Sequence, residues 1–158
     1  LEIMLKWLNL SALVIVFDQL SKWWANSALE LYQSIAVLPF FNITLAYNHG
    51  AAFSFLASES GWQRWFFTGL AVVVSIVLLF WLKRLKADAK LEAISLALIL
   101  GGALGNVIDR VIHGYVIDFL DVYYGTYHWP AFNVADSAIC IGAILLILDS
   151  FRNKTEQK

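Results

Sequence analysis

Two aspartates stand in surroundings that suit acid–base chemistry. Asp118 lies between Ile117 and Phe119 in an apolar stretch, where burial would raise the pKa of its carboxyl. Asp136 lies near the start of a long apolar run, where it could equally be a helix cap or a dipole partner. Two carboxyls held together cannot both ionise easily, so they share a proton. The ionised one can activate water and the protonated one can donate to a peptide carbonyl, which is aspartic-peptidase chemistry.

Other polar residues fall at the ends of long apolar runs. These residues are Asp18, Lys22, Asn106, Asp109, Arg110 and Asn133. A charge at mid-membrane costs about 2.5–3.5 kcal/mol on insertion scales, so such groups need partners or an interface. Asp18 and Lys22 are four residues apart and can pair on one helix face, which is an alternative to direct chemistry. Gly101 and Gly105 form a small-xxx-small pair that predicts close helix packing.

Several other functions lack the residues they need. The chain has no HExxH or GxSxG motif, and no Cys/His cluster indicates a metal site. The net charge of −1 and the lack of a basic tract argue against nucleic-acid binding. His49, His113 and His128 are scattered, and we interpret them as hydrogen-bonding or interfacial groups. We interpret Asp121 as a solvated loop residue.

Four apolar runs could position these groups. Hydrophobic residues make up 60% of the 158 residues and charged residues 15%, against about 45–50% and about 25% in soluble domains. Runs long enough to cross a bilayer cover Trp7–Trp24, Trp65–Leu82, Leu91–Ile112 and Phe132–Phe151. No small-x-small cleavage site ends the first run, so we expect a retained helix. The predicted fold is a single all-α membrane domain over 1–158, with four transmembrane helices.

The distribution of Lys and Arg predicts the orientation. The cations on one side of the threaded chain are Lys6, Lys83, Arg84, Lys86, Lys90, Arg152, Lys154 and Lys158. Both termini should therefore be cytoplasmic, and segments 25–64 and 113–131 should face the periplasm. The first outer segment should be β-rich, with strands over Phe40–Tyr47 and Ala51–Leu56. Ser58–Phe66 should form a short interfacial helix.

Five ordered blocks resemble the lipoprotein signal peptidases (signal peptidase II). They are FDQLSK at 17–22, YNHGAAF at 47–53, GGALGNVIDR at 101–110, VIDF at 116–119 and FNVADS at 132–137. Each block alone is weakly specific. Their shared order, on matching spans over most of the chain, makes the resemblance specific.

The resemblance implies a bacterial inner-membrane enzyme that needs no metal or organic cofactor. It implies a catalytic dyad of Asp118 and Asp136. The residues it implies for substrate binding or site support are Asn48, Gly50, Asn106, Asp109, Arg110, Asn133, Asp18 and Lys22. The implied substrate is a prolipoprotein whose cysteine carries a diacylglyceryl thioether, cleaved on the N-terminal side of that cysteine within membrane lipid. The implied inhibitor is the cyclic peptide globomycin.

Two other classes of protein remain as alternatives. A small membrane transporter or proton-coupled carrier also uses intramembrane Asp, Arg and Asn. Such a carrier should show polar residues through the depth of the membrane, whereas here they gather at one end. A non-catalytic assembly factor would use the outer segment as a binding surface, and neutral substitution of its aspartates would leave its function intact.

Overall fold

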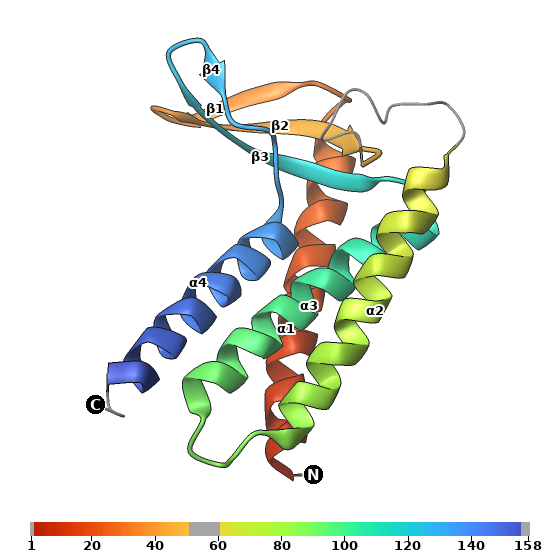
Figure 1. Cartoon of the computed structure of the whole chain (residues 1–158). Coiled ribbons are helices and arrows are strands. Elements are labelled where there is room, and N and C mark those ends of the chain that lie inside the picture. Colours follow the sequence, from red (N-terminus) through yellow and green to blue (C-terminus); the bar gives the residue numbers. More distant parts are fainter. Residues whose placement is uncertain (1, 51–60, 156–158) are drawn as a thin grey trace.

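A bundle of helices carries a small sheet at one end. The computed structural model describes residues 2–50 and 61–155. Its helices are α1 (Glu2–Ala28), α2 (Trp62–Arg84), α3 (Lys90–Ile112) and α4 (Val134–Thr155). Its strands are β1 (Ser34–Leu38), β2 (Phe41–Asn48), β3 (Val116–Tyr124) and β4 (Tyr127–His128). The start of α1, the end of α4 and the α2–α3 connection lie at the end of the bundle opposite the sheet (Figure 1).

Three of the described helices are long and apolar enough to cross a membrane. They are α2, α3 and residues Val134–Arg152 of α4. The four predicted helices are all present, each within a few residues of its predicted limits apart from longer ends on α1. The described part of α1 is not among them, and Asp18, Gln19 and Lys22 interrupt its apolar run.

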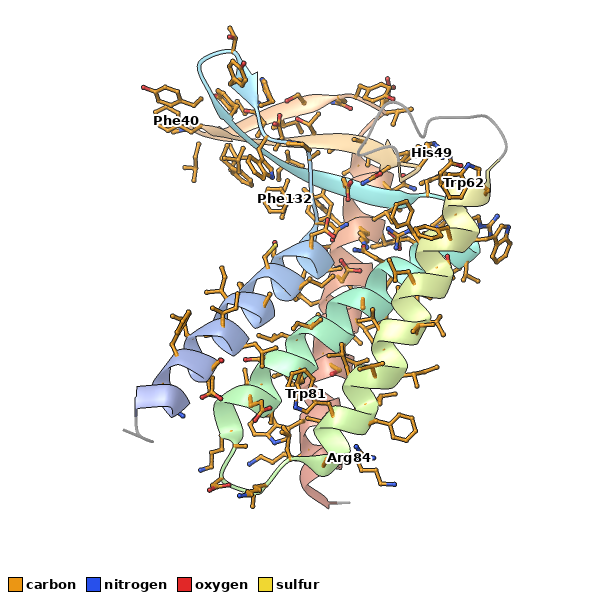
Figure 2. The ribbon with its side chains drawn as sticks, viewed as in Figure 1. Phe40, His49, Trp62, Trp81, Arg84 and Phe132 are labelled. Atoms are coloured by element: carbon orange, nitrogen blue, oxygen red, sulfur yellow. The ribbon has the colours of Figure 1, made fainter. Side chains whose placement is uncertain are left out.

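The outer surface of the bundle is apolar. Leu13 and Phe17 of α1 are exposed, as are Phe80 of α2 and Ile144 of α4. Cys140 also lies on an exposed part of α4. Trp62 lies at the sheet end of α2, whereas Trp81 and Arg84 lie at its other end (Figure 2). Water would not stabilise such a surface, whereas lipid would.

Glycines of α3 let α1 approach closely, as the sequence predicts. A Cβ at Gly101 would lie 2.8 Å from both Ser11 O and Val14 Cβ of α1. A Cβ at Gly105 would lie 2.6 Å from Asp18 Oδ2. Any larger residue would therefore push α1 away and disturb the polar groups it carries.

The sheet is antiparallel, in the order β1-β2-β3-β4. The predicted strand Phe40–Tyr47 is confirmed as β2, shifted by one residue. No strand was predicted over 113–131, but this segment forms β3 and β4. β3 is nearly all buried at its start, so it lacks the polar–apolar alternation that identifies a strand in a sequence.

Two other predictions fall on or near residues 51–60. The strand Ala51–Leu56 lies outside the described residues. The separate helix over Ser58–Phe66 is wrong in its described part, since Trp62–Phe66 forms the first turns of α2. Continuation of the α2 hydrogen bonds explains why those aromatic residues do not form a helix of their own.

Candidate active site

Asp118 and Asp136 are brought to one place by different elements. Asp118 lies within β3 and is 2% exposed, and Asp136 lies in the first turn of α4. Asn133 Nδ2 donates a hydrogen bond to Asp118 Oδ1 at 2.7 Å, and Asn106 Nδ2 donates to Asp136 Oδ1 at 2.7 Å. Asn133 Nδ2 also contacts Asn106 Oδ1 at 3.2 Å. The side-chain amides of Asn133 and Asn106 therefore join the two carboxyls through a continuous run of hydrogen bonds.

Asn133 also caps the helix that carries Asp136. Its Oδ1 accepts a hydrogen bond from the backbone N–H of Asp136 at 2.9 Å, and its side chain is fully buried. Asn is a favourable N-cap residue because its side chain satisfies a free N–H of the first turn. Asn133, and not Asp136, is therefore the cap of α4. The Asp136 carboxyl instead accepts a hydrogen bond from Asn106.

The surroundings of Asp118 favour its protonated form. Burial raises the pKa of Asp118 to about 7, and the negative charge of Asp136 adds to this effect. Hydrogen bonds from Asn48 and Asn133, together with the charge of Lys22, act in the opposite direction and are outweighed. A carboxyl that keeps its proton near neutral pH can serve as a general acid.

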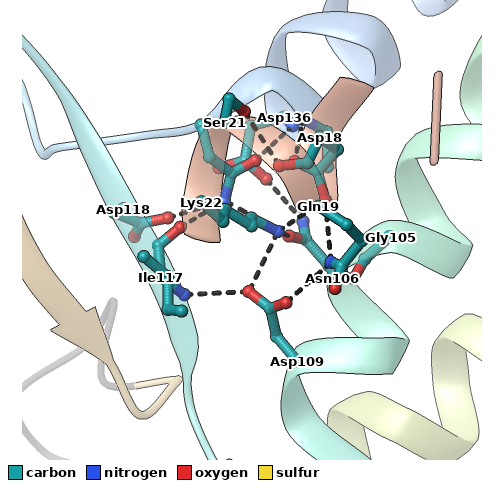
Figure 3. A network of polar contacts seen from close by, with 12 residues as sticks. Asp18, Gln19, Ser21, Lys22, Gly105, Asn106, Asp109, Ile117, Asp118 and Asp136 are labelled. Carbon is teal, nitrogen blue, oxygen red and sulfur yellow. Dashed lines mark hydrogen bonds and ion pairs between the residues drawn. The ribbon is translucent and has the colours of Figure 1, made fainter. Parts of the chain in front are cut away.

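A buried lysine organises the carboxylates beneath the pair. Lys22 is 1% exposed, and its Nζ lies 2.8 Å from Asp18 Oδ2 and 3.0 Å from Asp109 Oδ2. It also donates to Asn106 Oδ1 at 3.0 Å. The predicted Asp18–Lys22 ion pair is confirmed. The structure adds Asp109 and Asn106 of α3 as further partners (Figure 3).

This ion network also holds the backbone beside each candidate catalytic residue. Asp18 Oδ1 accepts from Ala135 N at 2.9 Å, one residue before Asp136. Asp109 Oδ2 accepts from Ile117 N at 3.0 Å, one residue before Asp118. The network thus ties α1 and α3 to the two segments that carry the pair.

Gln19 belongs to the same network, and sequence reasoning missed it. Its Nε2 donates to Asp109 Oδ1 at 2.8 Å and contacts Asp18 Oδ2 at 3.2 Å. Like Asp18 and Lys22, Gln19 is a polar residue in an apolar run, where an unpaired polar group costs free energy. The same reasoning could therefore have identified it.

Asn48 and Gly50 lie where β2 ends. Ala46 pairs with Asp118 across the β2–β3 ladder, so Asn48, two residues further on, shares the face of Asp118. Asn48 Oδ1 accepts from Gly50 N at 2.9 Å. Gly50 has a φ of +89°, and a Cβ there would lie 2.8 Å from the Phe67 ring. The tight turn therefore accounts for this glycine.

Arg110 faces a cavity instead of bonding to the pair. Within the described residues, its guanidinium lies 5.6 Å from the Phe67 ring centroid, and no hydrogen bond joins it to Asp118 or Asp136. The cavity, of about 310 Å³, opens between α2 and α4, with Arg110, Asn106 and Asp136 in its lining. A second cavity, of about 510 Å³, lies on the other side of Asp136 against the segment Trp129–Phe132.

Asp121 is not the solvated residue that the sequence predicted. It is 6% exposed, and His128 Nδ1 lies 2.7 Å from its Oδ1. Thr44 Oγ1 donates to its Oδ2 at 2.9 Å. The interpretation of His128 as a hydrogen-bonding group is confirmed by this contact. The error about Asp121 follows from the missed strand, because only pairing of β3 with its neighbours brings these groups together.

No metal centre is formed within residues 2–50 and 61–155. There, no group of three or more His, Cys, Asp or Glu side chains is arranged to hold a metal ion. The site is an acidic pair with amide partners, embedded at one end of a helix bundle.

Comparisons with known proteins identify a class of membrane enzyme with this fold. Two solved structures of bacterial membrane enzymes share the fold. One has a TM-score of 0.83 and 32% identity, covering 97% of this chain and 92% of that chain. The other has a TM-score of 0.79 and 34% identity, covering 91% of each.

Sequence comparison defines the family. The profile described as "Signal peptidase (SPase) II" matches residues 10–152, and the chain belongs to this family. A lipoprotein signal peptidase of Alteromonas mediterranea is 61% identical over 94% of this chain and 82% of its own length. A lipoprotein signal peptidase of Vibrio cholerae is 54% identical over 95% of this chain and 89% of its own length. The chain is accordingly a membrane protease of lipoprotein processing.

Proposed function

We propose that this chain is an aspartic endopeptidase with Asp118 and Asp136 as its catalytic dyad. Its substrate would be a prolipoprotein bearing a diacylglyceryl group on its cysteine, cut on the N-terminal side of that cysteine. The observation that carries the proposal is the amide bridge, in which Asn133 and Asn106 hold carboxyls of two separate segments in one buried polar site.

The two carboxyls take different roles in this mechanism. The raised pKa of Asp118 supports it as the carrier of the shared proton. Asp136 would then accept a proton from water as that water attacks the scissile carbonyl. Asp118 would donate its proton to the carbonyl oxygen. The hydrogen bond from Asn106 goes to Oδ1 of Asp136, and we assign Oδ2 of Asp136 to the attacking water.

The cavities beside Asp136 suit an extended, lipid-modified peptide. We assign the cavity between α2 and α4 to part of the substrate, with Arg110 and Asn48 near its backbone. Guanidinium and amide groups can donate to peptide carbonyls as the chain crosses the dyad. We expect the peptide inhibitor globomycin to compete for this site. Asp18, Lys22 and Asp109 would support the site without touching the substrate.

We further propose that α1 is a fourth transmembrane helix in the bacterial inner membrane. Its 27 residues exceed the length needed, and its polar residues Asp18 and Lys22 are buried against α3. Both termini would be cytoplasmic and the sheet periplasmic. A cysteine at exposed Thr126, in a Cys140→Ala background, should then react with a membrane-impermeant reagent from the periplasm. Labelling only from the cytoplasm would reverse the orientation.

The central experiment replaces each aspartate by its uncharged isostere. We expect Asp118→Asn and Asp136→Asn each to abolish cleavage of a purified lipid-modified precursor in vesicles. Asp88→Asn, a matched change in the exposed α2–α3 connection, should cleave like the wild type. Full cleavage by either dyad variant would reject the dyad. A non-catalytic assembly factor would instead give no cleavage by the purified wild type.

The same proteins test the carrier alternative. A proton-coupled carrier predicts pH-driven uptake into vesicles that the aspartate variants lose, without cleavage of a precursor by the wild type. The observation against a carrier is the position of the polar network, which lies at the sheet end of the bundle (Figure 3).

A further inference from the structure

A line of polar contacts crosses all four strands on the face of the sheet opposite Asp118. Thr44 Oγ1 of β2 lies 2.8 Å from Ser34 Oγ of β1 and 2.9 Å from Asp121 Oδ2 of β3. Asp121 Oδ1 lies 2.7 Å from His128 Nδ1 of β4. One buried carboxylate thus receives hydrogen bonds from both neighbouring strands.

Asp121 is held in its ionised form. Burial acts to raise its pKa, but hydrogen bonds from His128, Thr44 and Asn42 outweigh it, so the pKa of Asp121 lies below its ordinary value. An ionised carboxylate only accepts hydrogen bonds, so His128 Nδ1 must carry a proton. The His128 ring also stacks on Tyr123, with centroids 5.1 Å apart. The imidazole therefore has a defined orientation although it is half exposed.

The segment that follows His128 leads directly to the site. Trp129 N donates to Val122 O at 2.8 Å, and Leu120 N donates to Phe132 O at 2.8 Å. Residues 129–132 therefore lie along β3, and the next residue is Asn133. Asn133 binds Asp118 and caps α4. The seating of β4 on β3 consequently helps to set where Asn133 meets Asp118.

We propose that Asp121 and His128 are positioning residues for peptide cleavage, holding the β3–β4 hairpin so that Asn133 fixes Asp118 relative to Asp136. This inference rests on the proposed dyad. Neither residue touches the substrate. Loss of their contact would loosen the strand pairing and let the two carboxyls drift from reacting geometry.

Substitutions of His128 separate the effect of its hydrogen bond to Asp121 from the effect of its side-chain size. His128→Ala should lower kcat on the order of tenfold with little change in KM, because small misplacements near a reacting centre are costly. His128→Asn places an amide N–H close to the position of Nδ1 and should recover most of kcat. His128→Gln is the matched control, since its amide reaches the position of Nε2 and should stay near the Ala value. Equal kcat for wild type and His128→Ala, or equal rescue by Asn and Gln, would overturn the inference.

Thr44 gives an independent test that leaves His128 in place. Thr44→Val removes the hydroxyl that bonds Asp121 and should lower kcat severalfold, whereas Thr44→Ser should keep it near wild type. Equal kcat for both variants would count against the positioning role, and this test stands even if His128→Ala fails to fold. Asp118→Asn is measured in the same assay. Normal cleavage by this variant would reject the proposed dyad. If Asp118→Asn is inactive but every His128 and Thr44 variant cleaves like the wild type, only the positioning role is rejected.

Discussion

Asp118→Asn should make the protein more stable at neutral and alkaline pH while abolishing its activity. In the folded protein the pKa of the Asp118 carboxyl is about 7, against an ordinary value of 3.8. In the unfolded chain Asp118 loses its proton near pH 4, so between about pH 4 and pH 7 the native state binds more protons. The free energy of unfolding of the wild type should therefore fall as pH rises through this window and level off above it.

The size of the effect follows from the two pKa values of Asp118. The difference between 3.8 and about 7 corresponds to at most about 4 kcal/mol, at about 1.4 kcal/mol per pKa unit. An Asn at this position can still accept the hydrogen bond from Asn133 and has no charge to desolvate. At about 2–4 °C per kcal/mol, the variant should melt on the order of 10 °C above the wild type at pH 8.

Thermal unfolding in detergent from pH 4 to pH 9, followed by tryptophan fluorescence, measures this difference. The melting temperatures of wild type and variant should agree near pH 4 and separate as pH rises. Asp88→Asn should track the wild type at every pH. A variant no more stable than the wild type at pH 8, or a difference independent of pH, would refute the assignment of a buried, protonated Asp118.

Three further predictions test other parts of the site and fold. The kcat for precursor cleavage should fall above about pH 7 as Asp118 loses its proton, and a kcat still rising at pH 8 would contradict its role as acid. Lys22→Met leaves the buried carboxylates of Asp18 and Asp109 without their cation and should destabilise the protein by about 3–5 kcal/mol in denaturant titrations. A loss of unfolding free energy below about 1 kcal/mol would mean that the Lys22 ion network contributes little to stability. Gly101→Ala should cost about 1–3 kcal/mol by overpacking against α1, whereas Gly69→Ala, with open space around its Cβ position, should be neutral or slightly stabilising.

The sequence predicted those features that depend on local spacing or composition. The helices follow from long apolar runs, and the Asp18–Lys22 pair follows from a separation of four residues on one helix. The packing role of Gly101 follows from its small-xxx-small pattern. Each of these requires only that a helix form where the residues favour one.

Long-range contacts of the site could not be predicted in the same way. Asp18 reaches Ala135 N, and Asp109 reaches Ile117 N, only after the helices and β3 have packed together. β3 itself was missed because burial on both faces removes the alternation that marks a strand. The Asp121–His128 contact depends on that strand, so it was missed as well.

The central claim is that Asp118 and Asp136 share one proton, and infrared titration tests it most directly. The carbonyl absorption of a protonated carboxyl should be present in the wild type at pH 6, disappear with a midpoint near pH 7, and be absent from Asp118→Asn. In Asp136→Asn the midpoint should move to lower pH, because the neighbouring charge that raises the pKa of Asp118 is gone. A midpoint that Asp136→Asn leaves unchanged would contradict the claim.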